Sequence, residues 1–67
     1  MSVAKVIEVS ATSTESFEDA IRNGIDRANQ SVDNIQGAWV KEQHVDIEDS
    51  QIIDYRVDLK ITFMLRS

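Results

Sequence analysis

Apolar and polar side chains alternate along the segment Ile53–Leu65 with a period of two. The apolar positions are Tyr55, Val57, Leu59, Ile61, Phe63 and Leu65, and most of the residues between them are charged or polar. Because successive side chains of a β-strand point to opposite faces, this pattern predicts a long strand with one apolar and one charged face. Another part of the protein must cover the apolar face.

Two further segments are expected to be strands. The first is Val3–Val9, in which both faces are partly apolar, and the second is roughly Ala38–Glu48. The apolar positions of the second segment change from even to odd numbers midway, which predicts a β-bulge near Gln43–His44. The polar run Glu48–Gln51 is expected to be a short turn, so the second and third strands should pair antiparallel.

Between about Thr14 and Gln30 the period of the apolar positions changes to three and four residues. The repeating positions are Phe17, Ile21, Ile25, Ala28 and Val32. This spacing predicts one amphipathic helix. Acidic residues occupy its first turns, where the helix dipole favours negative charge. The opposite, charged face of this helix is expected to meet solvent.

The predicted order is therefore strand, helix, strand, strand. This order defines an α+β fold in which a three-stranded antiparallel sheet is partly wrapped around one helix. The helix covers one face of the sheet. The other face, which carries the charged positions of the third strand, is expected to meet water or further copies of the protein.

Length and composition favour self-association. The 67 residues are expected to form a single domain over 1–67, at the small end of what folds alone. A core of this size rarely provides more than about 3–5 kcal/mol of net stability. The absence of cysteine excludes disulfides and zinc sites built from thiolates. Oligomerisation is then the expected source of further stability.

Charge and hydropathy restrict the kinds of partner that the protein is expected to bind and the cellular location in which it is expected. The net charge of −5 argues against binding to nucleic acid, whose phosphates would repel the protein. The sequence has no apolar run near eighteen residues and no charged-then-apolar leader, so we expect neither a membrane span nor secretion. A cytoplasmic location is the corresponding expectation.

Trp39 and Arg56 are the residues most suited to bind a ligand. By parity both lie on the sheet face opposite the helix, and we expect them to be close together. An exposed indole can stack on a flat ligand, and a guanidinium can grip an anionic or carbonyl-rich group. The structural alternative is that Trp39 anchors a subunit contact and that Arg56 forms an intersubunit salt bridge with Asp58 or Glu8.

The remaining polar residues give weaker signals. His44 lacks metal-ligand partners and a nearby nucleophile pattern, so we expect a surface or interface histidine. Asp46, Glu48 and Asp49 lie around one turn and are weak candidates for calcium ligands, although their spacing is not that of an EF-hand loop. No pattern indicates a catalytic site, so the protein is expected not to be an enzyme.

Several segments together resemble the dodecin family across nearly the whole chain. They are Lys5–Glu8, Ala11–Ser13, Phe17–Ile21, Asp26–Ala28 and Tyr55–Leu65. The resemblance implies that twelve copies assemble into a hollow sphere. It also implies that flavins such as riboflavin, FMN or lumichrome bind in pairs between subunits, for storage or buffering and not for catalysis.

This chain departs from the family pattern at the positions that meet flavin. The stacking tryptophan of the family falls at Gly37, so Trp39 points to the same face but is displaced by about 7 Å along the strand. The glutamine that binds the flavin edge falls at Arg56. Basic positions that meet phosphates or coenzyme A in some bacterial members fall at His44 and Met64.

Two runs, Gln30–Ile35 and Phe63–Arg66, are more similar to a branch that lacks the flavin tryptophan and includes a calcium dodecin. The leading hypothesis is a flavin-storing homododecamer in which Trp39 stacks on the ring and Arg56 contacts its edge or tail, with Gly37 and His44 also at the site. The alternatives are a flavin-free shell that binds calcium or another small ligand, and a purely structural assembly.

Overall fold

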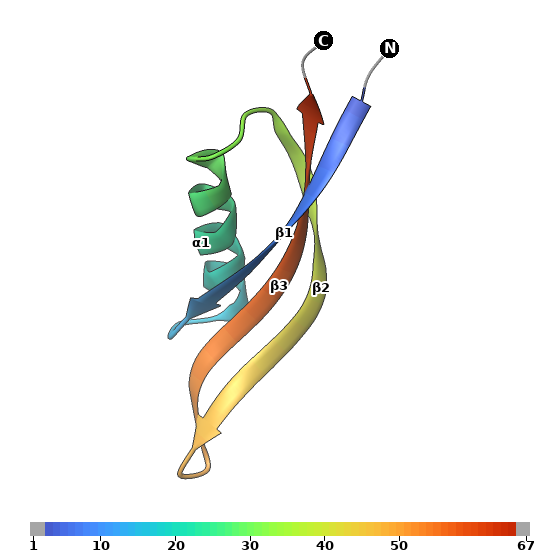
Figure 1. Ribbon diagram of the computed structural model, residues 1–67. Coiled ribbons are helices and arrows are strands. Elements are labelled where there is room, and N and C mark those ends of the chain that lie inside the picture. Colours follow the sequence, from blue (N-terminus) through green and yellow to red (C-terminus); the bar gives the residue numbers. More distant parts are fainter. Residues whose placement is uncertain (1–2, 66–67) are drawn as a thin grey trace.

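One helix and three strands make up the computed structural model, which describes residues 3–65 (Figure 1). The elements are β1 (Val3–Ser13), α1 (Phe17–Asn29), β2 (Ile35–Glu48) and β3 (Gln51–Leu65). The strands form one antiparallel sheet in the order β1-β3-β2, so the strand with the clearest alternation lies in the centre. The predicted α+β fold and element order are confirmed. Arg66, the last residue of the run Phe63–Arg66, lies outside the described residues.

The strands are longer than the sequence pattern indicates. β1 continues past Val9 to Ser13, because its last residues pair with β3 as far as Tyr55. β2 begins at Ile35 instead of Ala38. Pairing with the central strand thus carries β1 through Ser10–Ser13, beyond the end that the apolar pattern predicts.

Two serines fix the start of α1 at Phe17, three residues after the predicted start. Ser16 is the N-cap, and its hydroxyl accepts a hydrogen bond of 3.0 Å from the backbone N–H of Asp19. The buried Ser13 hydroxyl accepts from the Glu15 N–H at 2.9 Å and donates to the Asp19 carboxylate at 2.6 Å. These bonds satisfy donors that the first helical turn leaves free.

A two-residue turn joins β2 to β3, as predicted. Asp49 and Ser50 have φ angles of 51° and 64°, the left-handed conformations that a type I′ hairpin requires. The predicted bulge at Gln43–His44 is wrong. The register shifts instead between Val40 and Glu42, so the extra residue is Lys41.

The position of this bulge had no signal in the apolar pattern. Val40 pairs with Leu59 and Val45 pairs with Tyr55, so both lie on the helix side of the sheet. The residues between them are all polar, and a pattern of apolar positions therefore shows that one extra residue is present without showing which one it is.

The core lies between α1 and the helix side of β3. Its buried residues are Ala20 and Ala28 from the helix and Val57, Leu59, Ile61 and Phe63 from the strand. Gly24 lets the helix approach closely, because a Cβ at this position would lie 2.9 Å from Leu59 Cδ1 and 3.2 Å from Ala11 Cβ. The helix is thereby held directly over β1 and β3.

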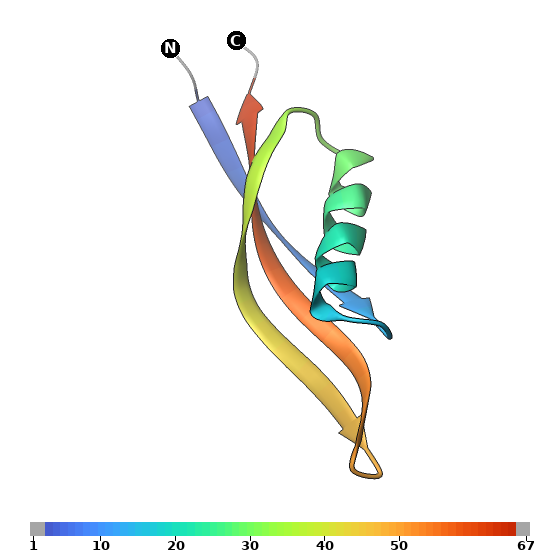
Figure 2. The ribbon, with the colours of Figure 1, turned by 180° about the vertical axis from the view of Figure 1, so that it is seen from behind.

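Most of β2 is left uncovered within one copy. The helix packs mainly against β1 and β3, and Val40, on the helix side of β2, is still 43% exposed. The end of the β2–β3 hairpin extends beyond the start of α1 (Figures 1 and 2). The radius of gyration is 13.8 Å, whereas a compact chain of this length has about 11 Å. One copy is therefore an elongated molecule with unpartnered surface.

The helix of the described part of the chain is too short and too polar to cross a membrane.

Replacement of Gly24 by valine should lower the free energy of unfolding by about 1–3 kcal/mol, because the new side chain overpacks the contact with Leu59 and Ala11. Gly37→Val is the matched control, since a Cβ added there would have no atom within 4 Å and valine suits a strand. Denaturant unfolding of both variants measures the difference. Equal losses at the two positions would contradict the close approach of α1 to the sheet.

Candidate functional site

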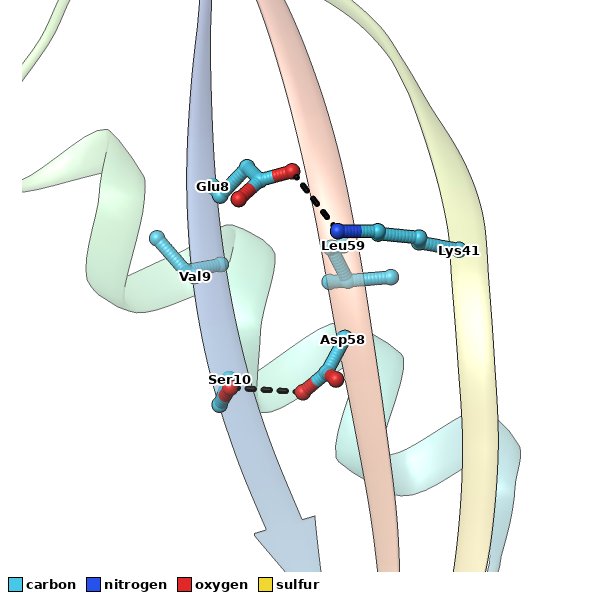
Figure 3. Close-up of a pocket in the computed structure, with 6 residues that line it drawn as sticks. All are labelled: Glu8, Val9, Ser10, Lys41, Asp58 and Leu59. Carbon is cyan, nitrogen blue, oxygen red and sulfur yellow. Dashed lines mark hydrogen bonds and ion pairs between the residues drawn. The ribbon is translucent and has the colours of Figure 1, made fainter.

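The candidate site is the face of the sheet opposite α1, called here the open face. The strand register assigns to it mainly polar residues: Glu8, Ser10 and Thr12 of β1, Arg56, Asp58, Lys60 and Thr62 of β3, and Gly37, Trp39, Glu42, His44 and Asp46 of β2. Toward the chain ends the same face carries the apolar residues Ala4, Val6 and Met64. The side chain of the bulged Lys41 also extends over this face (Figure 3). The middle of this face is therefore polar, as the alternation in β3 predicts.

A small ion network connects the three strands across the open face. Lys41 of β2 donates to Glu8 Oε1 of β1 at 3.3 Å (Figure 3). Lys60 Nζ of β3 lies 4.0 Å from the same oxygen. All three side chains are about half exposed, so the network contributes at most about 1 kcal/mol to stability. Two ammonium groups share the Glu8 carboxylate, so one acceptor joins the side chains of all three strands.

A shallow hollow of about 290 Å³ lies beside this network (Figure 3). Glu8, Ser10, Lys41 and Asp58 provide its polar lining, and Val9 and Leu59 complete it. The Ser10 hydroxyl donates to Asp58 Oδ1 at 2.6 Å. The hollow therefore presents both a carboxylate and an ammonium group to solvent.

Trp39 stands on the open face as predicted, with 65% of its surface exposed. Its direct partner on β3 is Lys60. Residues directly opposite each other in an antiparallel pair have Cβ atoms about 4.5–5.5 Å apart, so the indole and the ammonium stem are neighbours. Gly37 lies on the same face, pairs with Thr62, and leaves open space where its side chain would be.

The prediction that Arg56 lies near Trp39 is wrong. Arg56 is four residues from Lys60, the partner of Trp39, which is about 13 Å along the strand. Both residues lie on the predicted face, but parity gives only the face of a residue and not its position along the hairpin. Lys60 and not Arg56 is therefore the basic residue next to the tryptophan.

Arg56 instead joins His44 and Asp46 in a cluster nearer the hairpin end. His44 Nε2 lies 3.0 Å from Asp46 Oδ1, and Arg56 Nη2 donates to Asp46 Oδ2 at 3.4 Å. Arg56 and His44 are also direct partners in the register. The structure thus gives Arg56 an ion pair within its own chain, whereas the sequence suggested one with a neighbouring copy.

Two pairs of carboxylates face each other across β2 and β3. Glu42 is opposite Asp58, and Asp46 is opposite Asp54. Like charges directly opposite each other are destabilising unless a cation or a proton lies between them. Arg56 offsets the charge of Asp46, which also shares a hydrogen bond with His44, while the pair Glu42–Asp58 receives only the Ser10 hydroxyl among the contacts of the described residues.

Among the metal candidates from sequence, Asp46 is thus engaged by two basic side chains. Glu48 pairs with Gln51, and Asp49 lies in the turn. Within residues 3–65, no group of three or more His, Cys, Asp or Glu side chains is arranged to hold a metal ion.

Sequence reasoning missed Glu8, Lys41, Lys60 and Glu42 as site residues. The sequence did contain a signal for Lys60. Trp39 and Lys60 are equally far along the chain from the centre of the Glu48–Gln51 turn, so a regular hairpin would pair them. The bulge at Lys41 and a second shift between Asp46 and Ile47 cancel each other, so this simple count holds again at Trp39. The pair Glu42–Asp58 lies between these two register shifts, so counting from the turn does not identify Glu42 and Asp58 as partners.

Comparison with known proteins agrees with this architecture. The family model named Dodecin matches residues 3–66. A Mycobacterium tuberculosis protein named calcium dodecin is 41% identical over 66 residues, which are 98% of this chain and 93% of that protein. Its crystal structure, described as a calcium-chelating antigen with a novel calcium-binding site, has 39% identity and a TM-score of 0.82 over 96% of this chain and 91% of that chain. Dodecin from Streptomyces davaonensis has 35% identity and a TM-score of 0.93, with 98% and 97% of the two chains covered. The chain therefore belongs to the dodecin family.

Proposed function

We propose that this protein is a non-enzymatic, self-assembling dodecin that stores a flat, anionic aromatic ligand, a flavin such as FMN, on the open face. The observation that supports this most directly is Trp39, which is 65% exposed directly opposite Lys60 on a sheet face that the protomer leaves bare. An aromatic platform beside an ammonium group suits a ligand with a flat ring and a negatively charged tail.

Self-assembly is the first part of the proposal. The helix leaves β2 uncovered, and several large aliphatic side chains remain about half exposed or more. Monomeric proteins rarely expose contiguous apolar surface, and small domains without disulfides often gain their stability by oligomerisation. A shell of twelve copies, as the family resemblance implies, would cover this surface and bring open faces of different copies together.

The ligand would be held by the residues around Trp39. The ring would stack on the indole and occupy the open space at Gly37, where an added Cβ would have no atom within 4 Å. The anionic tail would lie near Lys60 and Lys41, which share a single carboxylate. Arg56 and His44 are already bound to Asp46, so we assign them a supporting position at the other end of the face.

We assign no catalytic role to any residue. The polar side chains of the open face form pairs that connect neighbouring strands: Glu8 with Lys41 and Lys60, Ser10 with Asp58, and Asp46 with His44 and Arg56. Storage requires only that the ligand binds and is released, and these pairs are sufficient to shape a binding surface.

Titration of FMN and riboflavin should quench the flavin fluorescence at ligand concentrations of tens of micromolar or below. Trp39→Ala should weaken binding of both flavins by about three- to tenfold, since one aromatic stack contributes about 0.5–1.5 kcal/mol. Lys60→Gln should weaken the binding of FMN more than the binding of riboflavin, because only FMN carries a phosphate.

Arg22→Gln on the helix surface is the control and should bind like the wild type. Sedimentation of each variant checks that the assembly is intact. If both flavins keep full fluorescence with the wild-type protein, flavin storage is wrong, and if Trp39→Ala abolishes assembly, the indole is a subunit anchor.

Calcium binding is a second candidate function. The relative that is 41% identical to this chain is named calcium dodecin. Calcium takes six to eight oxygen ligands, and the open face carries the opposed carboxylates Glu42 and Asp58, with the Ser10 hydroxyl bound to Asp58. Such pairs from neighbouring copies would together supply enough oxygens, with Asp46, Glu48 and Asp49 as further acidic groups toward the hairpin end.

Added calcium should then raise the melting temperature, and a chelator should reverse the rise, because a ligand that binds only the folded form stabilises it. Glu42→Gln should abolish most of the calcium-dependent rise, whereas Glu15→Gln, an exposed acid beside the helix start, should retain it. An unchanged melting temperature at millimolar calcium, or an equal rise for both variants, would contradict a site at this pair.

A further inference from the structure

A second depression lies on the other side of the molecule, between α1 and β1. Its floor is mainly apolar and its rim is polar, and its open volume is about 310 Å³. The lining residues are Ile7, Val9, Ser10, Ala11 and Thr12 of β1 and Asn23, Gly24, Arg27, Ala28 and Ser31 of the helix segment. We call this the α1–β1 groove. β1 is an outer strand of the sheet, so the groove runs along a sheet edge that no strand of the same copy covers.

The end of the β2–β3 hairpin is a projection, in contrast to the concave α1–β1 groove. Ile47, Ile52 and Ile53 are 63%, 52% and 47% exposed, on a narrow projection that extends beyond the start of α1 (Figures 1 and 2). Glu48 and Asp49 lie at the turn beside them. The hairpin end is thus an apolar projection with an acidic tip.

We propose that the hairpin end of one copy seats in the α1–β1 groove of the next copy. The inference rests on the self-association proposed above and identifies which surfaces meet. Within one copy the two surfaces cannot meet, because the groove is formed by the second half of α1 and the hairpin projects away from the helix start (Figure 1).

Three properties of the groove favour this occupant. Its apolar floor would cover the exposed isoleucines, and contiguous exposed apolar side chains mark interaction surfaces. Its volume is at the lower limit of pockets that enclose small molecules, but it suffices for a few aliphatic side chains. Arg27 on its rim is bound only to the neutral Gln30 among the contacts of the described residues, so its charge can pair with the acidic tip.

The contact is heterologous, since a different surface is used on each partner. Contacts of this type form closed rings when the rotation between copies closes, and open fibres when it does not. Every copy would both offer a hairpin end and receive one. A closed assembly of this kind therefore leaves no exposed isoleucine projection and no empty groove.

A charge reversal and its rescue test the contact. Arg27→Glu and Glu48→Lys, each in the full chain, should raise the protein concentration at half assembly at least tenfold, because each places like charges across the contact. The double variant Arg27→Glu/Glu48→Lys restores opposite charges and should return to within about threefold of the wild type, which corresponds to less than about 0.7 kcal/mol. Sedimentation velocity over a dilution series measures the assembly.

Arg22→Glu is the matched control, because it makes the same charge change on the exposed helix surface outside the groove. Far-UV circular dichroism confirms that each variant is folded. Single variants that assemble like the wild type, or a double variant no better than the singles, would overturn the docking of the hairpin. A wild-type protein that remains monomeric at every concentration would instead overturn the self-assembly on which the inference rests.

Discussion

One short helix cannot cover a sheet built from long strands, and the rest of the structure follows from this mismatch. α1 has 13 residues and is about 20 Å long, while β2 and β3 have 14 and 15 residues and extend about 46–50 Å. The helix therefore buries the middle of β3 and part of β1, and leaves β2 and the hairpin end bare. In the proposed assembly, further copies of the same chain cover the remainder.

The mismatch also separates two kinds of surface. The uncovered helix side of β2 and the hairpin end are apolar, and they are suited to contacts between copies. The open face is polar and has two ends, with Trp39 and Lys60 at one and the cluster of Asp46, His44 and Arg56 at the other. In the proposed shell the apolar surfaces are buried between copies, and this is why we propose the open face as the ligand site.

The sequence alone predicted the fold and the two faces of β3, but it left the faces of β1 open and placed Glu42 on the helix side, because the bulge was expected at Gln43–His44 and not at Lys41. The alternation in β3 is strong because that strand is central and its odd-numbered side chains between Val57 and Phe63 are buried. The pattern could not place the bulge at Lys41, since only polar residues lie between Val40 and Val45 and either sheet face accepts them. Periodicity identifies the face of a residue but not its neighbour on the next strand, and for this reason Arg56 was assigned a place beside Trp39 that Lys60 occupies.

We infer that a single copy leaves too much of its sheet uncovered to be the stable form of this protein. Sedimentation equilibrium of the purified wild-type chain measures whether this is so. We expect one closed species with a mass many times that of the 7.6 kDa chain, near the twelvefold multiple that a dodecin shell requires. A well-folded species of 7.6 kDa that persists at high protein concentration would contradict the account.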